Sequence, residues 1–266
     1  MRLLPVALLL AACSGAPEAA RVRLATTTST DNSGLLRWLL PPFEERTGIE
    51  VQVVAVGTGQ ALALGESGDA DLLLVHARER EEAFMAAGHG RERRDVMWND
   101  YVLLGPPGDP AQVRGLADAA EAFAKIASSG SLFVSRGDDS GTHIAERALW
   151  KRVGGVPGGR EWYREAGQGM GPCLMMADEM RAYLLADRGT YLSFRARLDL
   201  DVLVEGDLML RNPYGVILVD PARHRNVKAA PARMLMDYLT SPEGQRRIAE
   251  FRVGGEVLFH PVLGGS

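Results

Sequence analysis

Three short segments rich in hydroxyl residues and glycine are the places where this chain could do chemistry. Each follows an apolar run and precedes a helical pattern: residues 26–30, 57–59 and 135–142. The first N–H groups of a helix lack partners inside the helix and carry partial positive charge, so such a junction can hold an oxyanion. Hydroxyls add donors, and glycine lets the backbone approach closely. One junction alone can be only a helix N-cap, but three on one chain favour a shared anion site.

Arg136 lies inside the third of these segments, directly after a predicted buried strand. An arginine fork can hold a tetrahedral dianion through two N–H donors. Only three of the 30 basic residues are lysines, so the other 27 are arginines and the residue type alone is weak evidence for a site. A solvated or Asp-paired Arg136 therefore stays open as an alternative.

Other chemistries have weaker signals in this sequence. It has no Gly-Lys-Ser/Thr phosphate loop, and residues 57–59 do not form the Gly-x-Ser-x-Gly elbow of hydrolases. His143 and Glu146 are three residues apart, but without a second such pair we expect surface or cap residues rather than metal ligands. We expect His76 to form structural hydrogen bonds, and Cys173 to be a buried apolar residue without a nucleophilic role.

Alternating strand and helix patterns predict an α/β fold that positions these segments. In the first part of the chain we expect strands at residues 21–25, 49–56 and 71–75. We expect one helix at residues 35–47, broken by two prolines, and a further helix at residues 60–65. The second part should contain helices at residues 116–128, 142–152 and 177–186, and strands at residues 132–134 and 200–204. A strand and two helices then follow, at residues 214–219, 231–239 and 242–251.

The Gly- and Pro-rich segment 105–110 predicts a boundary between two lobes. We expect the strand at 214–219 to return to the first lobe. The predicted division is therefore residues 21–103 and 211–266 for lobe I and residues 104–210 for lobe II. Residues 1–20 are expected to be a signal peptide and tether.

The N-terminus has the pattern of an export signal. Arg2 precedes an apolar run at residues 3–12, which is too short to span a bilayer as a helix. The run ends in Leu-Ala-Ala-Cys at residues 10–13, which resembles a bacterial lipobox and predicts that Cys13 is lipidated. A plain cleaved signal peptide is the alternative. Either way, we expect an exported protein, periplasmic or at the cell surface.

The net charge limits the classes of partner. The formal charge is −4, and removal of residues 1–12 leaves 29 basic against 34 acidic residues, or −5. This acidic balance argues against general nucleic-acid binding. No later segment has 18 uninterrupted apolar residues, so we expect a soluble body.

Several long motifs from residue 21 to the end resemble those of substrate-binding proteins of Tup-type tungstate ABC transporters. The matching segments are residues 24–30, 32–36, 56–61, 68–71, 96–100, 133–142, 167–171, 187–191 and 212–216. Two departures from the family pattern are Trp98 and the Pro172-Cys173 pair.

This resemblance implies a two-lobed type II periplasmic-binding-protein fold, with a ligand cleft between lobes and two interlobe crossings. It implies a monomer that binds tungstate without a cofactor, a resident metal or catalytic residues, and that delivers the oxyanion to an ABC permease. It also implies that the arginine contributes to a preference for tungstate over molybdate. The implied ligand residues are Thr27, Thr28, Ser29, Thr58, Ser135, Arg136, Ser140, Gly141 and Thr142.

Two alternatives stay open at this point. The same fold could bind molybdate, or phosphate, whose proton needs an acceptor such as Asp138 or Asp139. An exported hydrolase is the other, and it would need a nucleophile and a base within hydrogen-bond reach.

Overall fold

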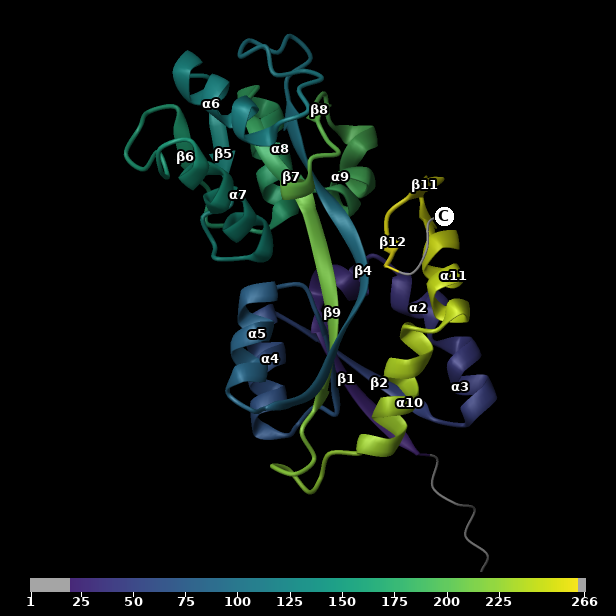
Figure 1. The fold of residues 1–266 in the computed structure, drawn as a ribbon. Coiled ribbons are helices and arrows are strands. Elements are labelled where there is room, and N and C mark those ends of the chain that lie inside the picture. Colours follow the sequence, from purple (N-terminus) through teal and green to yellow (C-terminus); the bar gives the residue numbers. More distant parts are fainter. Residues whose placement is uncertain (1–19, 263–266) are drawn as a thin grey trace, which may run out of the picture.

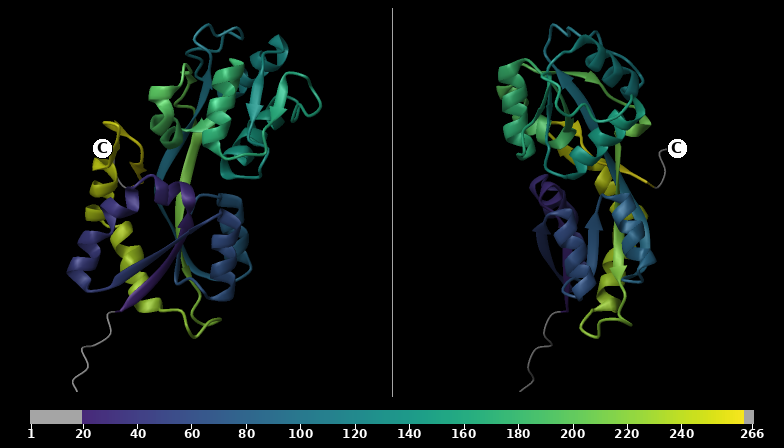
Figure 2. Two further views of the ribbon diagram at one scale, coloured as in Figure 1. Left: turned by 180° about the vertical axis from the view of Figure 1, so that it is seen from behind. Right: turned by 90° about the vertical axis from the view of Figure 1, so that its left-hand side faces the viewer.

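Two long strands join the two lobes of the molecule. The computed structural model describes residues 20–262, and Figures 1 and 2 show that β4 (Gly90–Gly105) and β9 (Arg211–Val219) run through both lobes. We call these the crossing strands. Two clusters of buried apolar side chains lie within residues 22–97 and 214–259, and two others lie within residues 101–210. The predicted two-lobed α/β fold class is confirmed.

Lobe I is built on a sheet whose first three strands are parallel. The strands β1 (Arg21–Thr27), β2 (Glu50–Val56) and β3 (Leu72–Val75) lie in the order β2-β1-β3, and β9 pairs antiparallel with β3. Every residue of β3 is buried, as its unbroken apolar run predicts. The covering helices are α1 (Thr28–Asn32), α2 (Leu35–Leu39), α3 (Pro41–Thr47), α4 (Thr58–Ser67), α5 (Arg78–Ala86), α10 (Ala229–Leu239) and α11 (Pro242–Glu250). The break that the two prolines predict falls between α2 and α3.

Lobe II continues the same sheet beyond the crossing. Its strands are β5 (Phe133–Ser135), β6 (Tyr163–Glu165), β7 (Tyr183–Asp187) and β8 (Asp201–Val204). Its helices are α6 (Ala119–Ser129), α7 (Gly141–Arg152), α8 (Met170–Met180) and α9 (Arg188–Phe194), with short 3-10 turns at Arg195–Arg197 and Leu208–Leu210. The C-terminal segment carries β10 (Arg252–Val253), β11 (Glu256–Val257) and β12 (His260–Pro261), of which β12 pairs with β4.

The helix predicted at residues 177–186 is wrong. The helix there begins earlier, at Met170, and ends where Arg181 adopts a left-handed conformation with φ 51°. The chain then forms β7, which lies between β4 and β5. Tyr183 and Leu185 enter one core cluster and Leu184 enters the other, so the strand is apolar on both faces. Burial in the middle of the sheet therefore decides its conformation.

The Gly- and Pro-rich segment at 105–110 ends β4 and does not mark the crossing. Strand β4 pairs with β9 as far as Asp100 and with β7 from Tyr101 onwards, without a break between them. The change of lobe thus occurs inside a continuous strand, where neither glycine nor proline is needed.

The predicted signal peptide, the predicted lipobox with Cys13 and nearly all of the predicted tether lie outside the described residues. Between residues 20 and 262, no helix combines the length and the apolar character needed to cross a membrane.

Candidate functional site

A cavity of about 730 Å³ lies between the lobes. Its floor comes from alternate residues of the crossing strands, Asn99 and Tyr101 of β4 and Asn212 and Tyr214 of β9. Alternate side chains of a strand point to the same face, so both strands present one face to this cavity. Its walls come from the junctions between strands and helices in the two lobes.

Eight of the nine predicted ligand residues line this cavity. They are Thr27, Thr28, Ser29, Thr58, Arg136, Ser140, Gly141 and Thr142. Ser135 is the exception, because it is fully buried in β5 and does not line the cavity. Its side chain lies beside Glu146 and Tyr163, on the strand face that it shares with Phe133.

Helices α4, α7 and α8 all begin at the cavity. Thr58 and Gly141 are the first residues of α4 and α7, and Met170 is the first residue of α8. The N-cap residues of α4 and α8 are glycines that provide no side-chain hydrogen bond to the helix. The first backbone N–H groups of these two helices therefore lack a side-chain cap, and they are suited to an anion.

Arg136 is paired with an aspartate and also lines the cavity. Its Nη2 donates to a carboxylate oxygen of Asp138, and the Arg136 side chain is only 15% exposed. Burial alone would raise the pKa of Asp138, but hydrogen bonds from Ser140 and the charge of Arg136 bring it below its ordinary value. Within residues 20–262, the buried Arg136 Nε has no hydrogen-bond partner. The guanidinium thus retains donors that an anion in the cavity could use.

Among the hydroxyl residues of lobe I that line the cavity, Thr28 and Ser29 are the exposed ones. Thr27 is 4% exposed, and its hydroxyl oxygen accepts a hydrogen bond from the backbone N–H of Thr30 at 3.3 Å. The hydrogen bonds expected of His76 are present, since its ring contacts Thr27 and Asn212, and the residue also lines the cavity.

Several lining residues were not predicted as ligands from the sequence. The start of α8, at residues 169–171, was missed because the helix was expected to begin at Ala177. The Gly-Gln-Gly-Met-Gly motif at 167–171 was the available signal. Asp187 and Thr190 also line the cavity, where the Asp187 carboxylate accepts from the Thr190 backbone N–H at 2.8 Å.

The His143 and Glu146 pair faces away from the cavity. His143 Nδ1 accepts from the Asp139 backbone N–H at 3.0 Å, which is a cap role as expected. Glu146, by contrast, is 1% exposed, so its expected place on the surface is wrong. It is buried because it accepts hydrogen bonds from the side chains of Trp150 and Tyr163 at 3.0 and 2.7 Å. Burial raises the pKa of Glu146 to about 7.

Cys173 is fully buried, as expected, and burial raises the pKa of its thiol. Within residues 20–262, His, Cys, Asp and Glu side chains form no group of three or more that could hold a metal ion.

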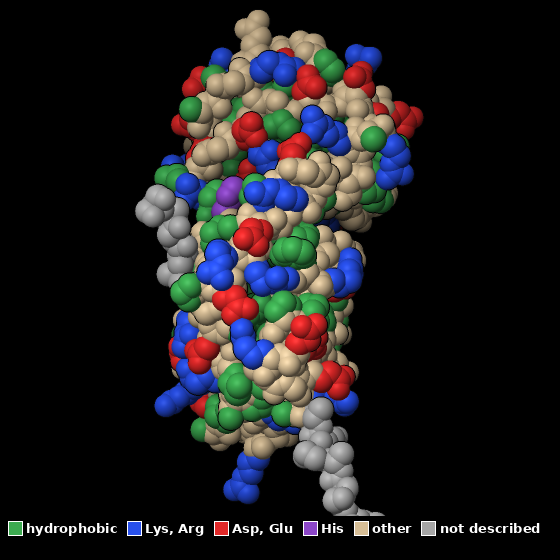
Figure 3. All heavy atoms as spheres, turned by 90° about the vertical axis from the view of Figure 1, so that its right-hand side faces the viewer, with side chains coloured by type: hydrophobic (Ala, Val, Ile, Leu, Met, Phe, Trp, Pro, Cys, Tyr) green, Lys and Arg blue, Asp and Glu red, His purple; other side chains and the backbone are tan. Residues whose placement is uncertain are grey.

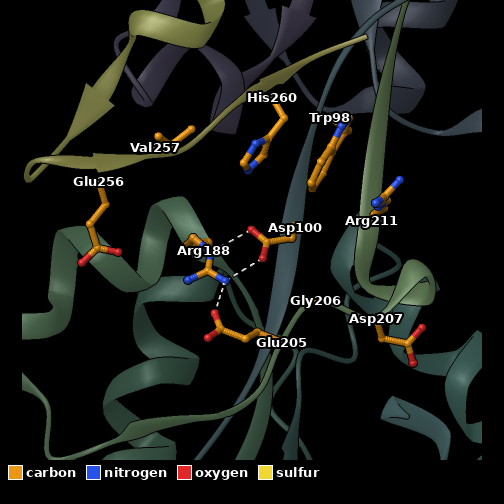
Figure 4. A pocket seen from close by; sticks show the side chains of 10 residues that line it. All are labelled: Trp98, Asp100, Arg188, Glu205, Gly206, Asp207, Arg211, Glu256, Val257 and His260. Atoms are coloured by element: carbon orange, nitrogen blue, oxygen red, sulfur yellow. Dashed lines mark hydrogen bonds and ion pairs between the residues drawn. The ribbon is translucent and has the colours of Figure 1, made fainter. Parts of the chain in front are cut away.

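A second cavity, of about 390 Å³, lies on the opposite face of the crossing strands. Trp98, Asp100 and Arg211 line it, and they alternate along the strands with the floor residues of the first cavity. In Figure 4, Arg188 points to the carboxylates of Asp100 and Glu205, with N–O distances of 2.6 to 2.8 Å. The ring of Trp98 is stacked on His260, a residue of lobe I. Four carboxylates, of Asp100, Glu205, Asp207 and Glu256, line this cavity against two arginines, Arg188 and Arg211. Its charge is therefore unsuited to a dianion, and we take the first cavity as the candidate oxyanion site.

This placement also locates the two departures from the family pattern. Trp98 faces the second cavity, and Pro172 and Cys173 lie in α8 without lining the first. None of the three contributes to the candidate site.

The fold and the site define a binding protein with a polar cleft between two lobes. The chain belongs to the PBP superfamily, whose domain is matched by residues 14–243. It is 53% identical over 230 residues to the tungstate-binding protein TupA of Peptoclostridium acidaminophilum, covering 86% of this chain and 80% of that protein. It is also 38% identical over 235 residues to TupA of Campylobacter jejuni, covering 87% of each.

Solved structures of such proteins share the fold. The tungstate-binding protein TupA from Desulfovibrio alaskensis G20 matches with a TM-score of 0.87 and 46% identity, covering 91% of this chain and 99% of that one. The tungstate ABC transporter structure from Geobacter sulfurreducens matches with a TM-score of 0.78 and 52% identity, covering 87% and 98%. The resemblance to Tup-type proteins that the motifs indicated is confirmed.

Proposed function

We propose that this protein captures tungstate outside the cytoplasm and delivers it to an ABC permease. One observation carries the proposal: hydroxyls, uncapped helix starts and Arg136 from both lobes converge on one cavity. Relatives at 38–53% identity that are named as tungstate-binding proteins support the choice of oxyanion.

Tungstate is an acceptor-only dianion, and the cavity offers donors that match it. Thr28 and Ser29 supply hydroxyls from lobe I, and the N-termini of α4 and α8 supply backbone N–H groups. Arg136 supplies charge and two further N–H donors in a mostly dry loop, where charge-assisted hydrogen bonds are strong. Closure of the lobes by bending of the crossing strands would bring both donor sets onto the ligand.

The proposal is capture rather than catalysis, with no cofactor and with the metal held only as its oxyanion. It includes export, a lipid anchor at Cys13 and a monomer that meets its permease at the membrane. The acidic and basic side chains that intermingle on the face in Figure 3 support a local binding mechanism, because they create no broad basic field there.

Phosphate is the second candidate ligand, and one observation favours it. Asp138, Asp139 and Asp187 line the cavity, and a carboxylate there can accept the proton of monohydrogen phosphate. Molybdate has the same shape and charge as tungstate, so it competes for the same donors.

Isothermal titration with tungstate, molybdate, sulfate and phosphate tests the proposal. We expect saturable heat with tungstate and weaker binding of sulfate and phosphate. Saturation by phosphate with no heat from tungstate would overturn the assignment. The tungsten content of protein purified without added oxyanion provides an independent check.

A further inference from the structure

A chain of hydrogen bonds crosses the floor of the cleft. His76 Nε2 lies 3.2 Å from the Thr27 hydroxyl oxygen, and His76 Nδ1 lies 3.1 Å from Asn212 Oδ1. The Asn212 amide nitrogen donates to Asn99 Oδ1 at 2.8 Å, and the Asn99 amide nitrogen donates to the Tyr214 hydroxyl at 3.2 Å. The imidazole ring therefore links the end of β1 to β9 directly and to β4 through Asn212.

The amide groups set the direction of this chain. Asn212 Oδ1 can only accept a hydrogen bond, so His76 Nδ1 carries the proton between them. Burial lowers the pKa of His76, although the bond to Asn212 and the charge of Asp187 oppose the shift, so the ring is neutral at pH 7. A neutral ring with its proton on Nδ1 can only accept at Nε2. The Thr27 hydroxyl is therefore the donor to His76.

The hydroxyl oxygen of Thr27 has two lone pairs, and the two donors of Thr30 fill them, so the Ser29 hydroxyl keeps its proton for a ligand. The Thr27 oxygen receives the Thr30 backbone N–H, and it lies 2.7 Å from the Thr30 hydroxyl and 3.1 Å from the Ser29 hydroxyl. A hydroxyl has a single proton, and His76 engages the proton of Thr27. Thr27 therefore has no donor left for a ligand, whereas Thr28 and Ser29 line the cavity with exposed side chains.

The His76 ring is also held between the two lobes. A Cβ placed on Gly141, the first residue of α7 in lobe II, would lie 3.2 Å from His76 Cε1 and 3.5 Å from the Tyr101 hydroxyl. On another side the ring packs on Tyr214, with centroids 4.7 Å apart. The close approach of Gly141 and the packing on Tyr214 leave the imidazole little freedom to turn away from Thr27.

We propose that His76 is a positioning residue of the oxyanion site, because its ring accepts a hydrogen bond from the Thr27 hydroxyl. This bond fixes the Thr27 oxygen as an acceptor for its other partners. In that role Thr27 caps α1 through the Thr30 backbone N–H and so fixes the first turn of the helix, which carries Thr28 and Ser29. Thr28 and Ser29 make the direct ligand contacts on this wall, and Thr27 acts through them. This inference rests on the proposed oxyanion-binding function.

A double-mutant cycle with tungstate titration tests the inference. His76→Leu and Thr27→Val each remove one end of a single hydrogen bond, so each should weaken binding by a similar factor, on the order of tenfold. The double variant should bind no more weakly than either single variant, because the two side chains act as one unit. Additive losses would overturn the inference.

Rescue by a conservative variant separates positioning from general disruption. The amide of His76→Gln has a donor nitrogen and an acceptor oxygen, where the neutral ring has one donor and one acceptor nitrogen. This variant should therefore recover most of the affinity that His76→Leu loses. A glutamine variant as weak as the leucine variant contradicts the positioning role. His89→Leu is the matched control outside the cleft and should bind like the wild type.

Failure of the proposed function gives a different result. A wild-type protein that does not bind tungstate overturns that function, and the cycle is then run with the oxyanion that does bind. Thermal melting checks that each variant is folded. If His76→Leu does not fold, the test compares two double variants, His76→Gln with Thr27→Val and His76→Gln with Thr27→Ser. In the His76→Gln background the valine change should again weaken binding about tenfold, and the serine change, which keeps the hydroxyl, should not. Equal binding of these two variants overturns the inference.

Discussion

Arg136→Ala should weaken tungstate binding about a hundredfold, because two hydrogen bonds to a charged ligand at about 1.5 kcal/mol each amount to about 3 kcal/mol. The number of bonds follows from the structure. One nitrogen of the guanidinium, Nη2, donates to Asp138, whereas the buried Nε has no partner within residues 20–262. Nη2 carries two N–H groups, and the one that Asp138 leaves forms a two-donor fork for the ligand together with Nε or Nη1 beside it. The loss also leaves the Asp138 carboxylate without its counter-charge beside a dianion, which acts in the same direction.

Titration calorimetry of Arg136→Ala, Arg136→Lys and the control Arg181→Ala measures this effect. Arg181 is an exposed arginine outside the cavity, so its alanine variant should bind like the wild type. The lysine variant keeps the charge without the fork and should lie between the wild type and alanine. If Arg136→Ala binds tungstate as tightly as the control does, then Arg136 serves only to pair with Asp138, and the argument for its ligand role fails.

Three further predictions concern the cleft and the supporting fold. Gly141→Ala should weaken tungstate binding in titration by about tenfold, because its Cβ would lie 3.2 Å from the ring of His76. Glu146, with its pKa raised from 4.5 to about 7, binds a proton more readily in the folded state; its contribution to stability is therefore complete below pH 4.5 and is lost as pH rises through 7. Urea unfolding at several pH values should show this loss in the wild type and not in Glu146→Gln. Arg188→Ala breaks a mostly buried ion pair and should lower the free energy of unfolding by about 3 kcal/mol, whereas Arg195→Ala, at an exposed pair, should change it by less than about 1 kcal/mol.

The predictable part of the site is local in sequence. The junctions at Thr28, Thr58 and Gly141 each join a strand to a helix within a few residues, so composition and periodicity are enough to find them. The start of α8 was harder, because residues 173–177 and 182–186 are both apolar runs, and such a run reads equally as a buried helix or a buried strand. Only the neighbouring strands decide where that helix ends.

The floor of the cleft could not be predicted from local patterns. His76 is 49 residues from Thr27 and 136 residues from Asn212, and only the return of β9 beside β3 brings them together. The side of each crossing strand that faces the ligand depends on register, since a shift by one residue would exchange Asn99 for Trp98. Ser135 illustrates the same limit: its place in a motif suggested a ligand, and strand alternation turns its side chain into the protein.

An acidic protein can hold an oxyanion because its local and its net charge are separate quantities. Surface charges more than about 10 Å from the ligand are largely screened at 0.1 M salt, so the formal charge of −4 has little influence inside the cleft. The carboxylates that do line it are engaged: Asp138 accepts from Arg136 and from the Ser140 backbone N–H, Asp139 accepts from Arg147, and Asp187 accepts from Thr190. These bonds lower the negative potential that an incoming dianion meets. An anion that entered the cleft without contacting the donors would still be repelled by these carboxylates. The arrangement therefore favours a ligand that is small enough to contact the donors of both lobes at once.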